Sequence, residues 1–101
     1  MINFIYTPQT LTQYVLIRDG CHLHYWLGGP SQQPLIIFMH GATMDHRMFN
    51  AQVEALIPHY RVLVWDARGH GQSKPIGSGF SLPICVQDML AILDDIQVSQ
   101  A

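Results

Sequence analysis

The chain has 101 residues, of which 49% are hydrophobic and 12% are charged, about half the charged share of an average globular domain. This length allows one small domain, and so few charged residues indicate more core-facing surface than a chain of this size covers alone. A net charge of −2 with only five Lys and Arg argues against a nucleic-acid partner, and the absence of any run near 20 apolar residues argues against a membrane span.

The first part of the chain has the pattern of a β-hairpin followed by a buried strand. Tyr14–Ile17 is predicted as a short strand, Asp19-Gly20 as a tight turn, and His22–Leu27 as a second strand with alternating polarity. Leu35–Met39 is apolar without alternation. Such a run is typical of a strand that is buried on both faces, as in a parallel sheet.

A helix and another buried strand come next. Phe49, Val53 and the pair Leu56-Ile57 recur at helical spacing until Pro58, which ends the pattern. Val62–Trp65 then forms a second apolar run. A strand, a crossover helix and a strand in this order predict a parallel pair.

The last part is predicted as a Gly- and Pro-rich loop, Ala67–Phe80, and a helix, Ser81–Ile96. Ser81 is placed to cap the helix, and Pro83 is tolerated in its first turn. An apolar stripe at helical spacing is expected to face the core: Leu82, Cys85, Val86, Met89, Leu90, Leu93 and Ile96. The whole succession predicts α/β architecture in one domain, residues 1–101.

Targeting and ligand signals are sparse. The start of the chain has no basic region before a long apolar run, so no signal peptide is predicted. Cys21 and Cys85 form neither a metal-ligand spacing nor a disulfide framework, which favours a reducing, cytoplasmic setting. His22 and His24 share one strand face without a third ligand in view. We therefore expect no metal and no cofactor.

Two motifs follow the two buried strands. His40-Gly41 comes directly after the first, and Asp66-x-Arg68-Gly69-His70-Gly71-x-Ser73 comes directly after the second. Together they resemble the α/β-hydrolase fold superfamily, over the range from Tyr14 to Val98. The resemblance implies the N-terminal part of an α/β-hydrolase sheet, truncated: a β-hairpin, a βαβ crossover and a following helix. It also implies that Val62–Trp65 lies between the hairpin and Leu35–Met39.

The resemblance assigns the first motif to the oxyanion hole. In similar enzymes the amide N–H just beyond His-Gly donates to the oxyanion, which points to Ala42. His40, Gly41 and Thr43 are then expected to contact a small-molecule substrate. The alternative is an ordinary strand-to-loop glycine, with His40 bonded to backbone groups.

The second motif is interpreted as architectural. Its glycines permit backbone angles that other residues avoid, and Asp66 and Arg68 are spaced to pair or to bond nearby backbone groups. The resemblance implies that Arg68 and His70 support the rim of a pocket. The alternative is that the arginine binds a substrate carboxylate.

No residue of a catalytic triad is predicted in this chain. In the resembling enzymes the order is nucleophile, acid, histidine, and the helix Ser81–Ile96 precedes the nucleophile. Ser73 lies too far from the end of its strand to be a nucleophile, and no triad role is expected for His59, Asp94 and Asp95.

The predicted function is therefore that of the N-terminal fragment of an α/β-fold hydrolase that acts on an ester, a lactone or a similarly activated carbon. The chain alone is expected to be inactive. The alternative is a non-catalytic short polypeptide that binds a complementary fragment or partner. If the chain is such a hydrolase fragment, the open edge of Leu35–Met39 is expected to need a complementary C-terminal segment or a partner strand, without which the chain should tend to aggregate.

Overall fold

The core of the fold is a four-stranded mixed sheet. The computed structural model describes residues 11–40, 44–77 and 79–97. Within them the strands lie in the order β1-β2-β4-β3, with β3 and β4 parallel and the other two pairs antiparallel. This order confirms the prediction that the strand after the crossover lies between the hairpin and β3. The strands are β1 (Thr12–Arg18), β2 (Cys21–Gly28), β3 (Leu35–Phe38) and β4 (Arg61–Trp65).

A two-residue turn joins β1 to β2. Arg18 pairs with Cys21 in the ladder, and Asp19 and Gly20 between them both have positive φ angles, 52° and 73°. Two left-handed residues give a turn whose twist matches that of the flanking strands. The predicted hairpin is confirmed, and it extends a few residues beyond the predicted ends.

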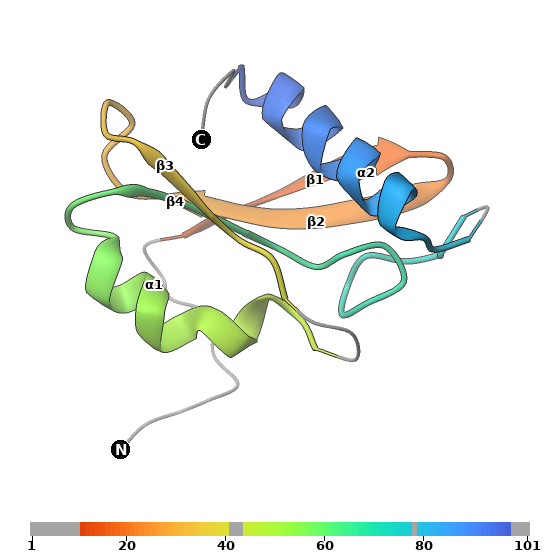
Figure 1. Cartoon of the computed structure of the whole chain (residues 1–101), viewed down its shortest axis with the longest axis horizontal. Helices are drawn as coiled ribbons and strands as arrows, with labels where there is room; N and C mark the ends of the chain where they lie inside the picture. The colour runs from red at the N-terminus through yellow and green to blue at the C-terminus, as the bar shows by residue number, and fades with distance from the viewer. Residues whose placement is uncertain (1–10, 41–43, 78, 98–101) are drawn as a thin grey trace.

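Helices cover both faces of the sheet (Figure 1). On one face lie the short 3₁₀ helix η1 (His46–Phe49) and α1 (Asn50–Leu56), and on the other lies α2 (Leu82–Asp95). Each face has its own apolar cluster. Trp26, Val53, Val62 and Val64 belong to the α1 side, and Tyr25, Leu63, Trp65, Cys85, Met89 and Ile92 belong to the α2 side. The described helices include none long and apolar enough to cross a membrane.

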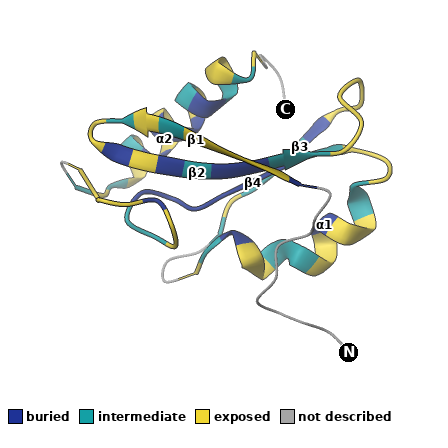
Figure 2. Ribbon diagram, turned by 180° about the vertical axis from the view of Figure 1, so that it is seen from behind, coloured by how far each residue is buried: buried dark blue, intermediate teal, exposed yellow. Residues whose placement is uncertain are grey.

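Strand β3 is less buried than predicted. It ends at Phe38, one residue before the predicted end, and Met39 is exposed. Ile36, Ile37 and Phe38 are only half-buried. The reason is that β3 pairs with β4 alone among the described strands, so its other edge is uncovered. β4, which has two neighbours, is buried at every position after Arg61, and β2, which also has two, is buried at half of its positions (Figure 2).

Helix α2 begins as predicted but buries a narrower face. The Ser81 side chain accepts a hydrogen bond from the Ile84 N–H, which is the expected N-cap. Cys85, Met89 and Ile92 are buried against the sheet. The expectation was wrong for Leu82, Val86 and Leu90, which are exposed, Leu82 at 76%. The apolar stripe is wider than the part of the helix that the sheet covers.

Candidate functional site

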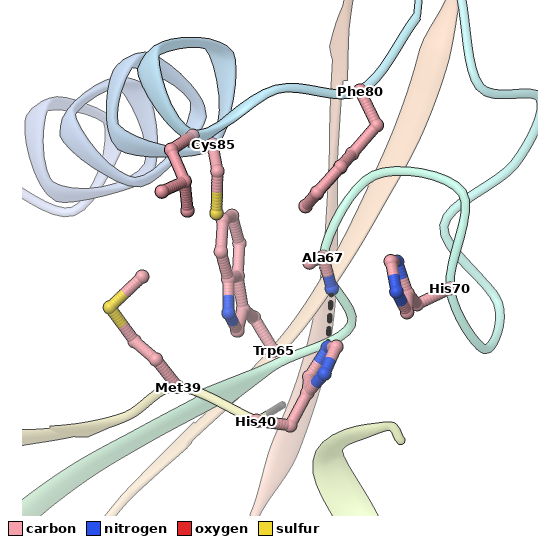
Figure 3. A pocket seen from close by; sticks show the side chains of 8 residues that line it. Met39, His40, Trp65, Ala67, His70, Phe80 and Cys85 are labelled. Carbon is pink, nitrogen blue, oxygen red and sulfur yellow. Dashed lines mark hydrogen bonds between the residues drawn. The ribbon is translucent and has the colours of Figure 1, made fainter. Parts of the chain in front are cut away.

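The two motifs meet at the carboxyl edge of the sheet. Because β3 and β4 are parallel, His40 and Ala67, which follow them, lie at the same edge. The Ala67 N–H donates to His40 Nε2 across 2.8 Å (Figure 3). His40 thus has the backbone partner that the alternative interpretation expected, and its contact with substrate stays a prediction. Gly41, Ala42 and Thr43 lie outside the described residues.

A pocket of about 360 Å³ opens beside this hydrogen bond. Its walls are mainly apolar, and the imidazoles of His40 and His70 both line it, with ring centres 5.2 Å apart. His70 Nδ1 lies 3.0 Å from the Arg68 carbonyl oxygen, which can only accept, so this nitrogen carries the proton. Figure 3 labels seven of the lining residues: Met39, His40, Trp65, Ala67, His70, Phe80 and Cys85. Leu82 is the eighth lining residue.

Asp66 is the buried acid of the site. Its Oδ1 accepts from the His46 backbone N–H at 2.8 Å and lies 2.7 Å from His46 Nδ1. Its Oδ2 accepts from the Gln72 N–H at 2.8 Å. Burial alone would raise the pKa of Asp66, but these hydrogen bonds from His46 and Gln72 outweigh it and hold the pKa below its ordinary value. Asp66 does bond backbone groups, as predicted, and it does not pair with Arg68.

Acid should weaken the Asp66 contacts. Because the folded-state pKa lies below the ordinary value of 3.8, the stabilisation is present above that value and is lost as the pH falls through the folded pKa. The stability difference between the wild type and Asp66→Asn should therefore be larger at about pH 5 than at about pH 3. Urea denaturation at both pH values measures it, with exposed Asp94→Asn as the control. A difference that does not change with pH would contradict the assignment.

Arg68 is buried in a network of ion pairs. Its Nε and Nη2 donate to the two carboxylate oxygens of Asp88 at 3.0 and 2.9 Å, and its Nη1 donates to Asp19 at 2.5 Å. Arg18 also donates to Asp88, at 2.6 Å. These contacts join α2, the hairpin turn and the loop after β4, and they support the architectural role predicted for Arg68. Sequence reasoning missed Asp88, although a carboxylate among the apolar positions of a helix was an available signal.

The four residues for which no triad role was predicted are either bonded within the fold or exposed. The Ser73 hydroxyl is buried, donates to the Asp66 carbonyl oxygen and accepts from the His24 N–H. Asp95 accepts from the Tyr25 hydroxyl at 2.8 Å. Asp94 and His59 are exposed. The Ser73 hydroxyl thus both donates to and accepts from backbone groups, which supports a structural role.

One cluster of possible metal ligands occurs in the described residues. Asp45, His46 and Asp66 bring one ligand atom each within 4.8 Å of one another. Protein partners account for these groups, since Asp66 binds His46 and the Asp45 carboxylate binds Arg47. His22 and His24 are not part of this cluster, and the His24 ring is 2.7 Å from the Gln13 amide nitrogen. The cluster is an internal anchor of the fold.

Comparisons with known proteins agree on one fold. The family described as alpha/beta hydrolase fold matches residues 34–101. The chain is 39% identical over 84 residues to 3-oxoadipate enol-lactonase 1 of Acinetobacter baylyi, which is 83% of this chain and 31% of the relative. It is 30% identical over 89 residues to a bifunctional esterase/perhydrolase of Acinetobacter calcoaceticus, 87% of this chain and 32% of the relative.

Solved structures give the same result. A hydrolase from Pseudomonas aeruginosa superposes with a TM-score of 0.81 at 34% identity, over 94% of this chain and 36% of that protein. The enol-lactonase of Burkholderia xenovorans superposes with a TM-score of 0.76 at 29% identity, over 87% of this chain and 35% of that protein. The chain thus spans about a third of the length of the relatives it matches.

Proposed function

The chain belongs to the α/β hydrolase fold family, and from this premise we propose that it is the N-terminal portion of a hydrolase that acts on an ester, a lactone or a similarly activated carbon. The proposal rests on one observation: the two motifs meet at one edge of the sheet, where the Ala67 N–H donates a hydrogen bond to the His40 ring. The similarity to an enol-lactonase and an esterase supports this substrate range.

Ala42 is the proposed oxyanion donor. It lies two residues after His40, whose ring is held at the carboxyl edge of the sheet. A backbone N–H at that edge can stabilise the negative oxygen that develops when a nucleophile attacks a carbonyl carbon. In this proposal His40, Gly41 and Thr43 border the substrate.

The nucleophile and the rest of the triad are proposed to come from a part of the intact enzyme that follows this chain. The Ser73 hydroxyl is buried and bonded to backbone groups, and the Asp95 carboxylate is bonded to Tyr25. Here the intact enzyme means this chain together with the continuation of its reading frame. Residues 1–101 alone are then expected to show no triad-based hydrolysis.

Replacing Ala42 by proline tests the oxyanion role. Proline removes the N–H, so kcat of the intact enzyme for an ester or lactone should fall by about 10²–10³-fold. Ala42→Ser keeps the N–H and should retain most of the activity. Steady-state kinetics measure both variants. Full activity in a folded Ala42→Pro enzyme would contradict the assignment.

A second candidate function is binding without catalysis. The exposed side chains of Leu82, Val86 and Leu90 on α2 and the edge of β3 that no described strand covers favour it, because both offer surface to a partner protein. The unfolding of purified residues 1–101 separates the candidates. A sharp, cooperative transition of a monomer would favour the binding function, whereas aggregation that a complementary segment relieves would favour the hydrolase.

A further inference from the structure

Two adjacent residues hold both ends of the segment that connects β3 to η1. At the start of the segment, His40 Nε2 accepts from the Ala67 N–H at 2.8 Å. At its end, the backbone N–H and Nδ1 of His46 both face Asp66 Oδ1, at 2.8 and 2.7 Å. The contacts are made by neighbours in sequence, Asp66 and Ala67, directly after β4. The two residues that follow β4 thereby hold both ends of the connection that follows β3.

The contact with His46 is buried and fixed on several sides. Asp66 is 0% exposed and His46 is 3% exposed. The His46 ring stacks on Trp26, with ring centres 3.5 Å apart and planes at 18°. The second carboxylate oxygen of Asp66 accepts from the Gln72 N–H, which fixes the orientation of the carboxylate. Hydrogen bonds to a buried carboxylate are stronger than neutral ones, so this end has little freedom to shift.

Both histidines must carry their proton on the same ring nitrogen. His40 Nε2 accepts a hydrogen bond from a backbone N–H, so in the neutral ring the proton is on Nδ1. An ionised carboxylate can only accept, so His46 Nδ1 carries the proton that points at Asp66. The lowered pKa of Asp66 agrees with an ionised carboxylate. The hydrogen-bond geometry therefore assigns one proton to Nδ1 of His40 and one to Nδ1 of His46.

We propose that Asp66 and Ala67 act as a clamp on the segment from His40 to His46, with Asp66 and His46 as positioning residues for the reaction of the intact enzyme. The positioning role rests on the proposed function, because it matters only if Ala42, within this segment, donates to the oxyanion. The clamp itself consists of described residues alone. Displacement of a catalytic donor by about 1 Å can cost about 10²-fold in rate, so both ends of the segment have to be held.

The protonation states test the clamp without any activity assay. Two-bond ¹H–¹⁵N correlation spectra of the intact enzyme should show His40 and His46 both protonated on Nδ1, with His40 Nε2 unprotonated. The exposed His59 is the internal reference for a ring in solvent. A proton on His40 Nε2, or an unprotonated Nδ1 in His46, would overturn the clamp.

A matched pair of variants tests the positioning role. His46→Asn keeps a side-chain N–H that can reach Asp66, whereas His46→Leu removes it. In the intact enzyme, His46→Leu should lower kcat by about 10²-fold with KM little changed, and His46→Asn should recover most of kcat. Equal kcat values for His46→Leu and the wild type would overturn the positioning role. An intact enzyme that hydrolyses no ester or lactone would overturn the proposed function and with it that role, while the spectra would still decide on the clamp.

Discussion

Replacing Arg68 by methionine should lower the free energy of unfolding by about 3–5 kcal/mol, the range for a buried ion pair that loses one partner. The Arg68 side chain is 1% exposed, and it donates two hydrogen bonds to Asp88, which is 0% exposed. Without Arg68 the Asp88 carboxylate keeps, among the ion pairs of the described residues, only the one with Arg18, whose side chain is 34% exposed. The loss should therefore lie toward the lower end of this range. Urea denaturation followed by circular dichroism measures it.

A double variant is the control for this prediction. Arg68→Met combined with Asp88→Leu replaces both members of the pair by apolar side chains of similar length, which is often neutral for stability. The double variant should therefore be more stable than Arg68→Met alone. A loss below about 1 kcal/mol in Arg68→Met, as is typical of surface pairs, would contradict the network.

Replacing Val53 by aspartate should abolish soluble expression or cost more than about 4 kcal/mol. Val53 is 0% exposed and belongs to the cluster between α1 and the sheet, with Trp26, Val62 and Val64. A carboxylate at this position would lose its water without gaining a partner. The yield of soluble protein and the midpoint of thermal unfolding measure the effect.

The neighbouring position gives a matched control. Gln52 is exposed on the same helix, so Gln52→Asp should be nearly neutral. The two variants place the same carboxylate at adjacent positions, one on the exposed side and one on the buried side of α1. Equal effects would mean that the assigned helical phase is wrong.

Local patterns in the sequence predicted most of the secondary structure, but they did not separate the 3₁₀ helix η1 from α1. The spacing of Phe49, Val53 and Leu56 predicted the buried side of α1, and Val53 is buried as expected. Ser81 predicted the start of α2, and Asp19-Gly20 predicted the hairpin turn. Each of these signals acts within a few residues of the chain, where backbone geometry and side-chain spacing are closely linked.

The pairings across the chain could not be predicted in the same way. Asp66 binds His46, and Arg68 binds Asp88, and each pair joins residues 20 positions apart. Spacing alone does not choose among several possible partners for a carboxylate. The exposure of Leu82 and Met39 also depends on which neighbours cover α2 and β3, which periodicity does not report. For the candidate site, the sequence located the edge of the sheet and missed the contacts from Asp66 to His46.

The release of acid from esters and lactones, measured for the extended protein and for residues 1–101, tests most directly whether this chain is the N-terminal portion of a hydrolase. Reading the coding sequence past Ala101 and expressing the encoded protein gives the enzyme to assay beside residues 1–101. We expect an apolar strand followed by G-x-S-x-G or G-x-D-x-G, hydrolysis by the extended protein and none by residues 1–101. A stop codon directly after Ala101, or hydrolysis by residues 1–101 alone, would contradict this expectation.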